Sequence, residues 1–360
     1  MVQDTLKIQG ALKVQGDLHL GTGRFGPIIP FTWEITNWVA NIKAAGLPTP
    51  SYYNLQTTNL FLLSLSGANI RNKIKRLNLF NGGDGGDWRA SFFPIINDIG
   101  NTYDYCGSAT NIAQFGTTSF RSTDWSLTSG FNAQGAYPAG NTRAQVSGGI
   151  ADTYTKWIDT TVAINNPVFS SDSVNPLYNI HMSVYTTAYG TGNGQVTDIG
   201  ATAGTPTPFF TALQSAYSST FPSNQLFGAS RWNSYQQDTN SLAGGSLISS
   251  RYISPVGFFV GSRLNQSYST IYKDGSIITG FGGGSINPDT NFATSATLNN
   301  DTIVVFGRGN HTTSGARKIN DFNDRCIGMY SIGLGLTDTD AANFNNIVTA
   351  FNTAIGRPIY

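Results

Sequence analysis

The order of apolar and polar positions divides the chain into a short repeat, a helical region and a long run of strands. Residues 6–20 repeat with a period of six, and apolar side chains alternate there with polar ones. This alternation predicts strands with one apolar face. Because so narrow a face has no second layer of its own, the repeat needs a partner surface. The apolar positions that would make this contact are Leu6, Ile8, Leu12, Val14, Leu18 and Leu20.

Two interpretations of this repeat stay open. In one, three copies of the chain wind around a threefold axis, and the apolar positions are contacts between copies. In the other, the repeat forms a small meander that lies on the rest of its own chain. The first interpretation makes residues 1–30 a β-repeat attachment or trimerisation segment followed by a linker, which we place at residues 24–30.

After the linker the pattern changes to a helical period. Apolar residues at positions 35, 38, 39 and 42 fall on one helix face, and Thr32 is the expected N-cap. A second helix is predicted over residues 51–62. Together these elements predict a small helical hairpin within residues 31–80. A third, short helix in this region is predicted from the apolar positions Ile70, Ile74 and Leu77.

From Trp88 to about Gly335 the chain has the pattern of strands and turns. The segment 273–276 (Lys-Asp-Gly-Ser) predicts a type I′ hairpin turn. Many short strands with irregular loops are typical of a two-sheet sandwich. The chain ends in a predicted helix, which Thr337 and Asp340 open in a capping-box arrangement. The clearest predicted strands lie at residues 179–185, 256–261, 269–273, 302–306 and 326–334.

Three segments within residues 88–360 carry a resemblance to a known family: 269–275 (Ser-Thr-Ile-Tyr-Lys-Asp-Gly), 303–308 (Ile-Val-Val-Phe-Gly-Arg) and the closing Ile332-Gly-Leu-Gly-Leu336-Thr-Asp. The chain resembles the concanavalin A-like (laminin-G/pentraxin-like) jelly-roll modules of tailed-phage virion structural proteins. The resemblance implies a mainly β fold, with a jelly-roll sandwich and C-terminal helix over residues 81–360. Such modules decorate virions, build fibres or bind surface glycans, so the resemblance supports the fold more than the function.

Composition narrows the class of protein. Charged residues make up 11% of the 360 residues, where about 25% is typical of a globular domain. A net charge of +1 with scattered basic residues argues against a nucleic-acid footprint. No apolar run approaches the ~18 residues of a membrane-spanning helix. Met1–Thr5 lacks the basic start of an export signal, so we expect assembly into a virion within the host cytoplasm.

Catalytic patterns are few, and we expect no enzyme. None of His19, His181 and His311 lies near a Gly-x-Ser-x-Gly motif; His181 falls in a predicted strand and His311 in a predicted loop. Glu34, the only glutamate, lies on the first predicted helix, and no acidic pair is evident for glycoside hydrolysis. The segment 82–87 (Gly-Gly-Asp-Gly-Gly-Asp) matches a calcium repeat only once, so we interpret it as a flexible connector.

Two kinds of binding site remain as expectations. The resemblance implies calcium held by loop oxygens, but the acids that could supply them (Asp152, Asp159, Asp172, Asp198 and Asp238) are scattered and assign no ligand set. Two polar-aromatic stretches in predicted loops, 185–189 and 231–235, could stack sugar rings. The glycan-binding candidates are Arg231, Trp232 and Tyr235.

Cysteine content adds little to this picture. Cys106 and Cys326 are too few for a disulfide framework, and we expect them to be small buried residues. A single bridge between them stays open and would need an oxidising compartment. The leading hypothesis is a phage virion structural protein, namely a head fibre, a capsid decoration protein or a tail-fibre component, whose partners are its own copies in a trimer and other virion proteins. The alternative is an adhesin that binds a host surface glycan. A glycoside hydrolase or lyase is the least favoured class.

Overall fold

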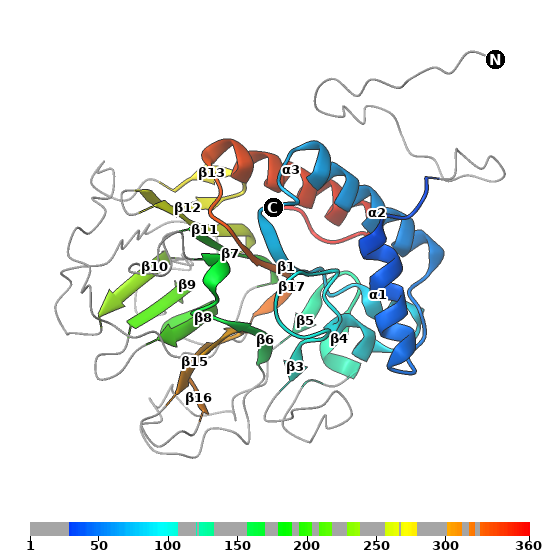
Figure 1. Cartoon of the computed structure of the whole chain (residues 1–360), viewed down its shortest axis with the longest axis horizontal. Coiled ribbons are helices and arrows are strands. Elements are labelled where there is room, and N and C mark those ends of the chain that lie inside the picture. The colour runs from blue at the N-terminus through cyan, green and yellow to red at the C-terminus, as the bar shows by residue number, and fades with distance from the viewer. Residues whose placement is uncertain are drawn as a thin grey trace, which may run out of the picture.

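In the described part of the chain, two β-sheets lie face to face, and three helices pack at the outer side of one of them (Figure 1). The computed structural model describes residues 29–106, 120, 122–132, 157–169, 179–188, 194–203, 209–217, 229–237, 256–265, 268–278, 301–311, 317–320 and 325–360. The mainly β sandwich class expected from the sequence is confirmed. The N-terminal repeat lies outside the described residues.

The first sheet, sheet A, has its longest strands at its centre, where β7 pairs with both β11 and β17. The other edge of β17 pairs with two strands, with β5 at its N-terminal end and with β1 at its C-terminal end. All its pairings are antiparallel. In spatial order its strands are β13 (Ser276–Ile277), β12 (Tyr268–Lys273), β11 (Gly257–Asn265), β7 (Ile180–Ala188), β17 (Cys326–Gly333), β1 (Ile74–Asn78) and β2 (Ile96–Asn97), with β5 (Gly130–Asn132) and β4 (Trp125–Ser126) beside β17.

The second sheet, sheet B, is antiparallel except for one parallel contact between β8 and β15. Its order is β10 (Ala229–Gln237), β9 (Phe209–Tyr217), β8 (Gly194–Ala203), β14 (Thr302–Val305), β6 (Ile158–Ala163) and β3 (Tyr105–Cys106). The strands β15 (Arg308–His311) and β16 (Arg317–Asn320) extend it from β8. The two cysteines therefore lie on strands of different sheets.

The helices are α1 (Trp33–Ala44), α2 (Tyr52–Gly67) and α3 (Asp338–Ala354). In Figure 1, α3 crosses the top of the molecule and α1 and α2 lie to its right. Short 3-10 turns occur at η1 (Gly82–Gly85), η2 (Trp88–Phe92), η3 (Ser122–Asp124) and η5 (Pro167–Phe169). Within the described residues, none of the helices has the length and hydropathy needed to cross a membrane.

Sheet A is buried on both faces, which makes it the middle layer of the fold. Met182 and Val184 of β7 belong to a core between the sheets that also includes Ile199 and Val305 of sheet B. On the opposite face, side chains of sheet A join a second core beneath the helices. That core contains Tyr185, Phe258, Val260, Tyr272, Met329, Phe61, Phe344, Val348 and Phe351. This double burial explains why every residue of β17 is buried.

Several local predictions are confirmed. Thr337 and Asp340 form the complete capping box at the start of α3. Asp274 and Gly275 both have positive φ, as a type I′ turn between β12 and β13 requires. Thr32 is the N-cap residue of α1, although its hydroxyl makes no capping bond.

The third helix predicted from Ile70, Ile74 and Leu77 is wrong. Residues 74–78 form β1, which lies between β17 and β2 in sheet A. The i, i+4, i+7 spacing of Ile70, Ile74 and Leu77 suggests a helix, but it takes no account of the side chains of Arg76 and Asn78. Both side chains are instead buried, in a polar network described below.

The interpretation of residues 82–87 as a flexible connector is also wrong. Gly82 and Gly83 are buried, and Gly83 N donates to Ser91 Oγ at 2.8 Å. A Cβ on Gly82 would lie 2.3 Å from the carbonyl oxygen of Ala90. Asp84 accepts bonds from the amide and the hydroxyl of Ser51, the N-cap of α2. The glycines therefore allow close packing of a turn that holds the start of α2.

Candidate functional site

Several large apolar side chains of α2 are exposed on the described surface. Tyr52 is 62% exposed, Tyr53 43%, Leu60 40% and Leu63 39%, and Phe31 is 37% exposed. The ring of Phe31 packs edge-on against Tyr52 with centroids 6.1 Å apart. At 100° per residue, the four α2 positions fall within an arc of about 100°. We call these five residues the α2 face.

Charged residues are absent from the sequence of this helix and from the segments that directly precede and follow it. No Asp, Glu, Lys, Arg or His occurs between Lys43 and Arg71. A surface helix of a globular protein usually carries charged residues on its outer side. Depletion of charge together with aromatic enrichment is instead typical of the centre of a protein–protein interface. The α2 face therefore has the composition of a contact surface.

The inner side of α2 is unusually polar, and its hydrogen bonds fix the rotation of the helix. Asn54 Nδ2 donates to Asn81 O at 2.6 Å, and Asn81 Nδ2 donates to Asn54 Oδ1 at 2.6 Å and to Thr58 Oγ1 at 2.8 Å. All three side chains are buried. Phe61 adds an edge-on contact with Phe351 of α3 at 5.3 Å. Since these contacts hold one side of α2 inward, its apolar stripe must face outward.

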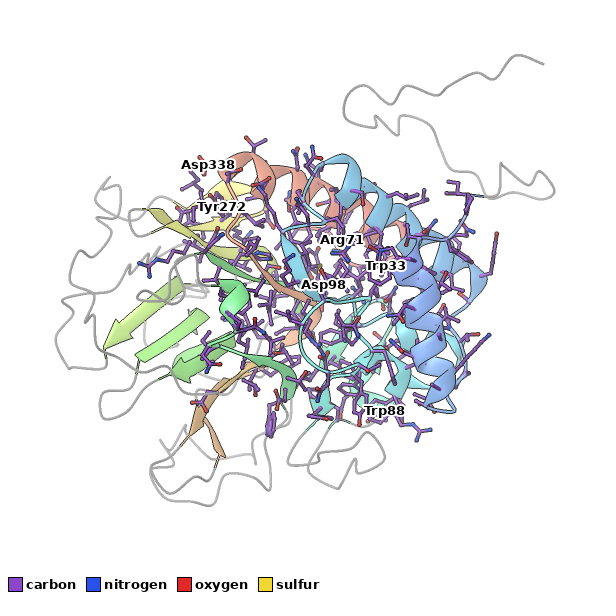
Figure 2. All side chains as sticks on the ribbon, viewed as in Figure 1. Trp33, Arg71, Trp88, Asp98, Tyr272 and Asp338 are labelled. Atoms are coloured by element: carbon purple, nitrogen blue, oxygen red, sulfur yellow. The ribbon has the colours of Figure 1, made fainter. Side chains whose placement is uncertain are left out.

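An ion-pair cluster of Arg71, Glu34 and Asp98 ties α1 to the segments beside β1 and β2 (Figure 2). Arg71 Nε donates to Glu34 Oε1 at 2.7 Å, and its two terminal nitrogens each donate to Asp98 at 3.1 Å. Burial alone would lower the pKa of Arg71, but the bonds to Asp98 and Glu34 outweigh it and raise the pKa. Trp33 lies 5.8 Å from this guanidinium. The only glutamate of the chain thus serves a structural pair.

A second polar cluster lies between the sheets and is completely buried. Arg76 donates from Nη2 to Asp104 Oδ1 at 2.7 Å and from Nη1 to the carbonyls of Ile99 and Asn101. Tyr330 Oη donates to Asp104 Oδ1 at 2.7 Å, and Asn78 Nδ2 donates to Asp104 Oδ2 at 2.8 Å. Burial and the Asp104 charge raise the pKa of Tyr330 well above its ordinary value, so the phenol keeps its proton. With no exposed atom to meet a solute, this network positions strands.

A serine–histidine arrangement occurs in sheet A, but it too is enclosed. His181 Nδ1 donates to Leu334 O at 2.6 Å, which leaves Nε2 to accept from Ser331 Oγ at 2.9 Å. The Oγ atoms of Ser183 and Ser331 are 2.6 Å apart. Burial lowers the pKa of His181 to about 4. All three side chains are fully buried, so the expected structural histidine is confirmed and no substrate reaches this pair.

Predicted binding residues fall in places that the sequence did not indicate. Residues 231–235 were expected in a loop, but they lie within strand β10. Tyr185 lies in β7, where it is 2% exposed and cannot stack a sugar ring. His311 is in strand β15 instead of a loop. The six apolar positions of the repeat lie outside the described residues, so the oligomer contact stays a prediction.

The acids considered for calcium are also separated where they are described. Asp159 lies in β6, and Asp198 in β8 is 3.7 Å from Arg325. Asp152, Asp172 and Asp238 fall outside the described residues. In the part of the chain that the structure covers, no three His, Cys, Asp or Glu side chains gather as metal ligands do. Calcium binding stays an untested expectation.

Sequence reasoning missed the α2 face, although a signal for it was present. The absence of charge between Lys43 and Arg71 is visible in the sequence. A helix without charged residues lacks the usual sign that marks its solvent-facing side. The sequence could not show which positions of α2 face outward.

Comparisons with known proteins give only partial likenesses. No family model and no curated protein matches the chain. Among solved structures, Trypanosoma rangeli sialidase in complex with 2,3-difluorosialic acid is similar over 47% of this chain and 23% of that chain, with 13% identity and a TM-score of 0.30. The same sialidase with the inhibitor DANA matches over 53% and 27%, at 14% identity and a TM-score of 0.30. The chain thus spans about a quarter of these proteins, and likenesses this low carry no functional argument.

Proposed function

We propose that this chain is a structural protein of a tailed-phage virion, namely a head-fibre, capsid-decoration or tail-fibre component. It works by assembly with other chains and by display of its sandwich. The α2 face is the observation that carries the proposal, because an uncharged apolar helix surface favours association with protein. The resemblance of residues 88–360 to virion jelly-roll modules supplies the virion context.

The polar clusters are consistent with a role in which the fold supports contact. Arg76 with Asp104, and His181 with Ser331, bond to groups within the protein interior. Their bonds connect β1 to residues 99–104 and β7 to β17. Such networks favour one defined arrangement of the layers over alternatives. We therefore assign their polar chemistry to the rigidity of the displayed sandwich.

Purified particles provide the direct test. Virions of the phage or prophage that encodes the chain are banded by density, washed in high salt and analysed by quantitative mass spectrometry. We expect the chain at a fixed copy number relative to the major capsid protein. A particle lacking the gene for this chain is the matched control for contaminating peptides. Expression of the chain in the infected cell together with its absence from washed particles would contradict the proposal.

Glycan binding stays the alternative, centred on Arg231, Trp232 and Tyr235 of β10. A glycan array probed with the full chain, with and without calcium, tests it. Binding that Trp232→Ala abolishes would support an adhesin. Release of reducing ends from host polysaccharide would instead indicate a hydrolase or lyase. If the array shows no binding and no reducing ends are released, assembly is the one of these three functions that the two assays do not contradict.

A further inference from the structure

We infer that the α2 face is an interface between copies of this same chain. The inference rests on the proposed assembly function and names the partner at that surface. The first support is that α2 exposes a second apolar surface, formed by Tyr52, Tyr53, Leu60 and Leu63, besides the apolar residues Phe61, Leu62 and Leu65 that it buries in the core. The exposed apolar side chains of this helix are removed from water when a second protein surface covers them.

The surface is chemically suited to a neutral partner like itself. It has no charged residue to pair with a basic, acidic or nucleic-acid partner. Its side chains are two tyrosines, a phenylalanine and two leucines, which offer apolar area for burial together with two hydroxyl groups. The Tyr53 hydroxyl already donates to Ala354 O, and Tyr52 Oη accepts from Gln56 Nε2 at 3.0 Å. These bonds hold both rings in place before contact.

The position of the face along the chain favours a second copy over another protein. Phe31 follows the predicted oligomerising repeat closely, and the chain from Leu20 to Phe31 reaches about 40 Å at most, even if fully extended. If copies associate through the repeat, each α2 face is therefore held near the faces of its neighbours. Tethering of this kind raises the effective concentration of one face for another.

Other exposed apolar residues provide an internal comparison. Ile277 of β13 is 45% exposed, slightly more than Leu60, but it lies beyond α3 on the edge strand of sheet A. Its strand has two residues, and Ser276 beside it is also exposed. Ile277 thus shares exposure with the α2 face, but no other exposed large apolar residue is found on its strand or the described part of β12.

Site-specific photo-cross-linking of the full chain tests the inference. Leu60 is replaced by the photoreactive residue p-benzoylphenylalanine, and a second protein carries the same residue in place of Ile277. After irradiation at micromolar concentration, we expect covalent dimers of this chain from position 60 at a yield at least tenfold above that from position 277. Adding Leu63→Glu should reduce the position-60 yield at least tenfold. Circular dichroism and thermal melting of each variant check that the fold is retained.

Each other outcome overturns the inference. Cross-links from position 60 that map within the same chain would show that its own segment covers the face. The inference is also contradicted by cross-links to a different virion protein. Equal yields at positions 60 and 277, or no product at position 60, would contradict it in the same way. Because particle incorporation is measured separately, a chain that is present in virions but gives no chain–chain product leaves the assembly function intact.

Discussion

Removal of the buried Asp104 carboxylate should destabilise the sandwich far more than removal of a partly exposed one. Asp104 and Arg76 have no exposed side-chain surface, and Asp104 accepts bonds from Arg76, Tyr330 and Asn78. In Asp104→Ala the guanidinium of Arg76 keeps its bonds to the Ile99 and Asn101 carbonyls but loses its counter-charge.

The expected magnitude follows from this geometry. Breaking a buried ion pair by removing one partner typically costs about 3–5 kcal/mol, because the remaining charge stays buried. Asp98 is the matched control, since it pairs with Arg71 but is 27% exposed. For a pair of this kind the expected cost of Asp98→Ala is about 0–1 kcal/mol.

Equilibrium unfolding in guanidinium chloride, followed by tryptophan fluorescence at fixed protein concentration, measures both free energies. We expect Asp104→Ala to lower the free energy of unfolding by at least about 3 kcal/mol with an unchanged m-value. A loss below about 1 kcal/mol, or one no larger than that of Asp98→Ala, would refute the reasoning. Arg76→Met combined with Asp104→Ala should cost less than the two single losses added together, since the pair is removed as a unit.

Three further predictions concern other buried groups. The pKa of His181 is about 4 in the folded protein, against an ordinary value of 6.5 for a histidine in the unfolded chain. Between these two pH values, His181 is therefore protonated in the unfolded chain but neutral in the folded protein. The free energy of unfolding should therefore fall by about 3 kcal/mol as pH drops from 6.5 to 4, and His181→Gln should flatten this dependence in urea titrations. Arg357 donates to the carbonyls of Leu127, Gly328 and Leu79, and burial lowers its pKa to about 9, so it is charged at neutral pH. Arg357→Met should cost about 2–4 kcal/mol and increase hydrogen exchange in the last residues of the chain; unchanged exchange there would contradict this anchoring role. Gly82→Ala should cost about 1–3 kcal/mol in the same unfolding assay because its Cβ would meet the Ala90 backbone, whereas Gly67→Ala, which meets nothing within 4 Å, should be neutral; equal effects would exclude the close-packing argument.

The double burial of sheet A explains why four of the five clearest predicted strands belong to it. Residues 326–334 are apolar or small on both faces, since one side packs against sheet B and the other lies beneath the helices. The same burial explains why candidate chemistry in sheet A proved structural. His181 and Tyr185 lie on β7, the central strand, where no large ligand can reach them.

Local interactions let the sequence determine the start of α3, one hairpin turn and the buried face of α1 by itself, whereas the second helix, predicted over residues 51–62, continues to Gly67. The capping box of Thr337 and Asp340, the Asp274–Gly275 turn and the apolar face of α1 each depend on neighbours a few residues away. These features need no knowledge of the rest of the molecule, and each is present in the structure.

Only tertiary contacts decided the remaining features. Ile74 and Leu77 fit a helical spacing and a strand about equally, and pairing with β17 and β2 selected the strand. Arg76 could enter the interior only because Asp104 and Tyr330, distant in sequence, supply its partners there. The outward direction of the α2 face was likewise set by partners outside the helix, Asn81 and Phe351. A sequence pattern indicates which side chains prefer water. The partners that neutralise a buried charge, or that fix the rotation of a helix about its axis, come together only when the chain folds.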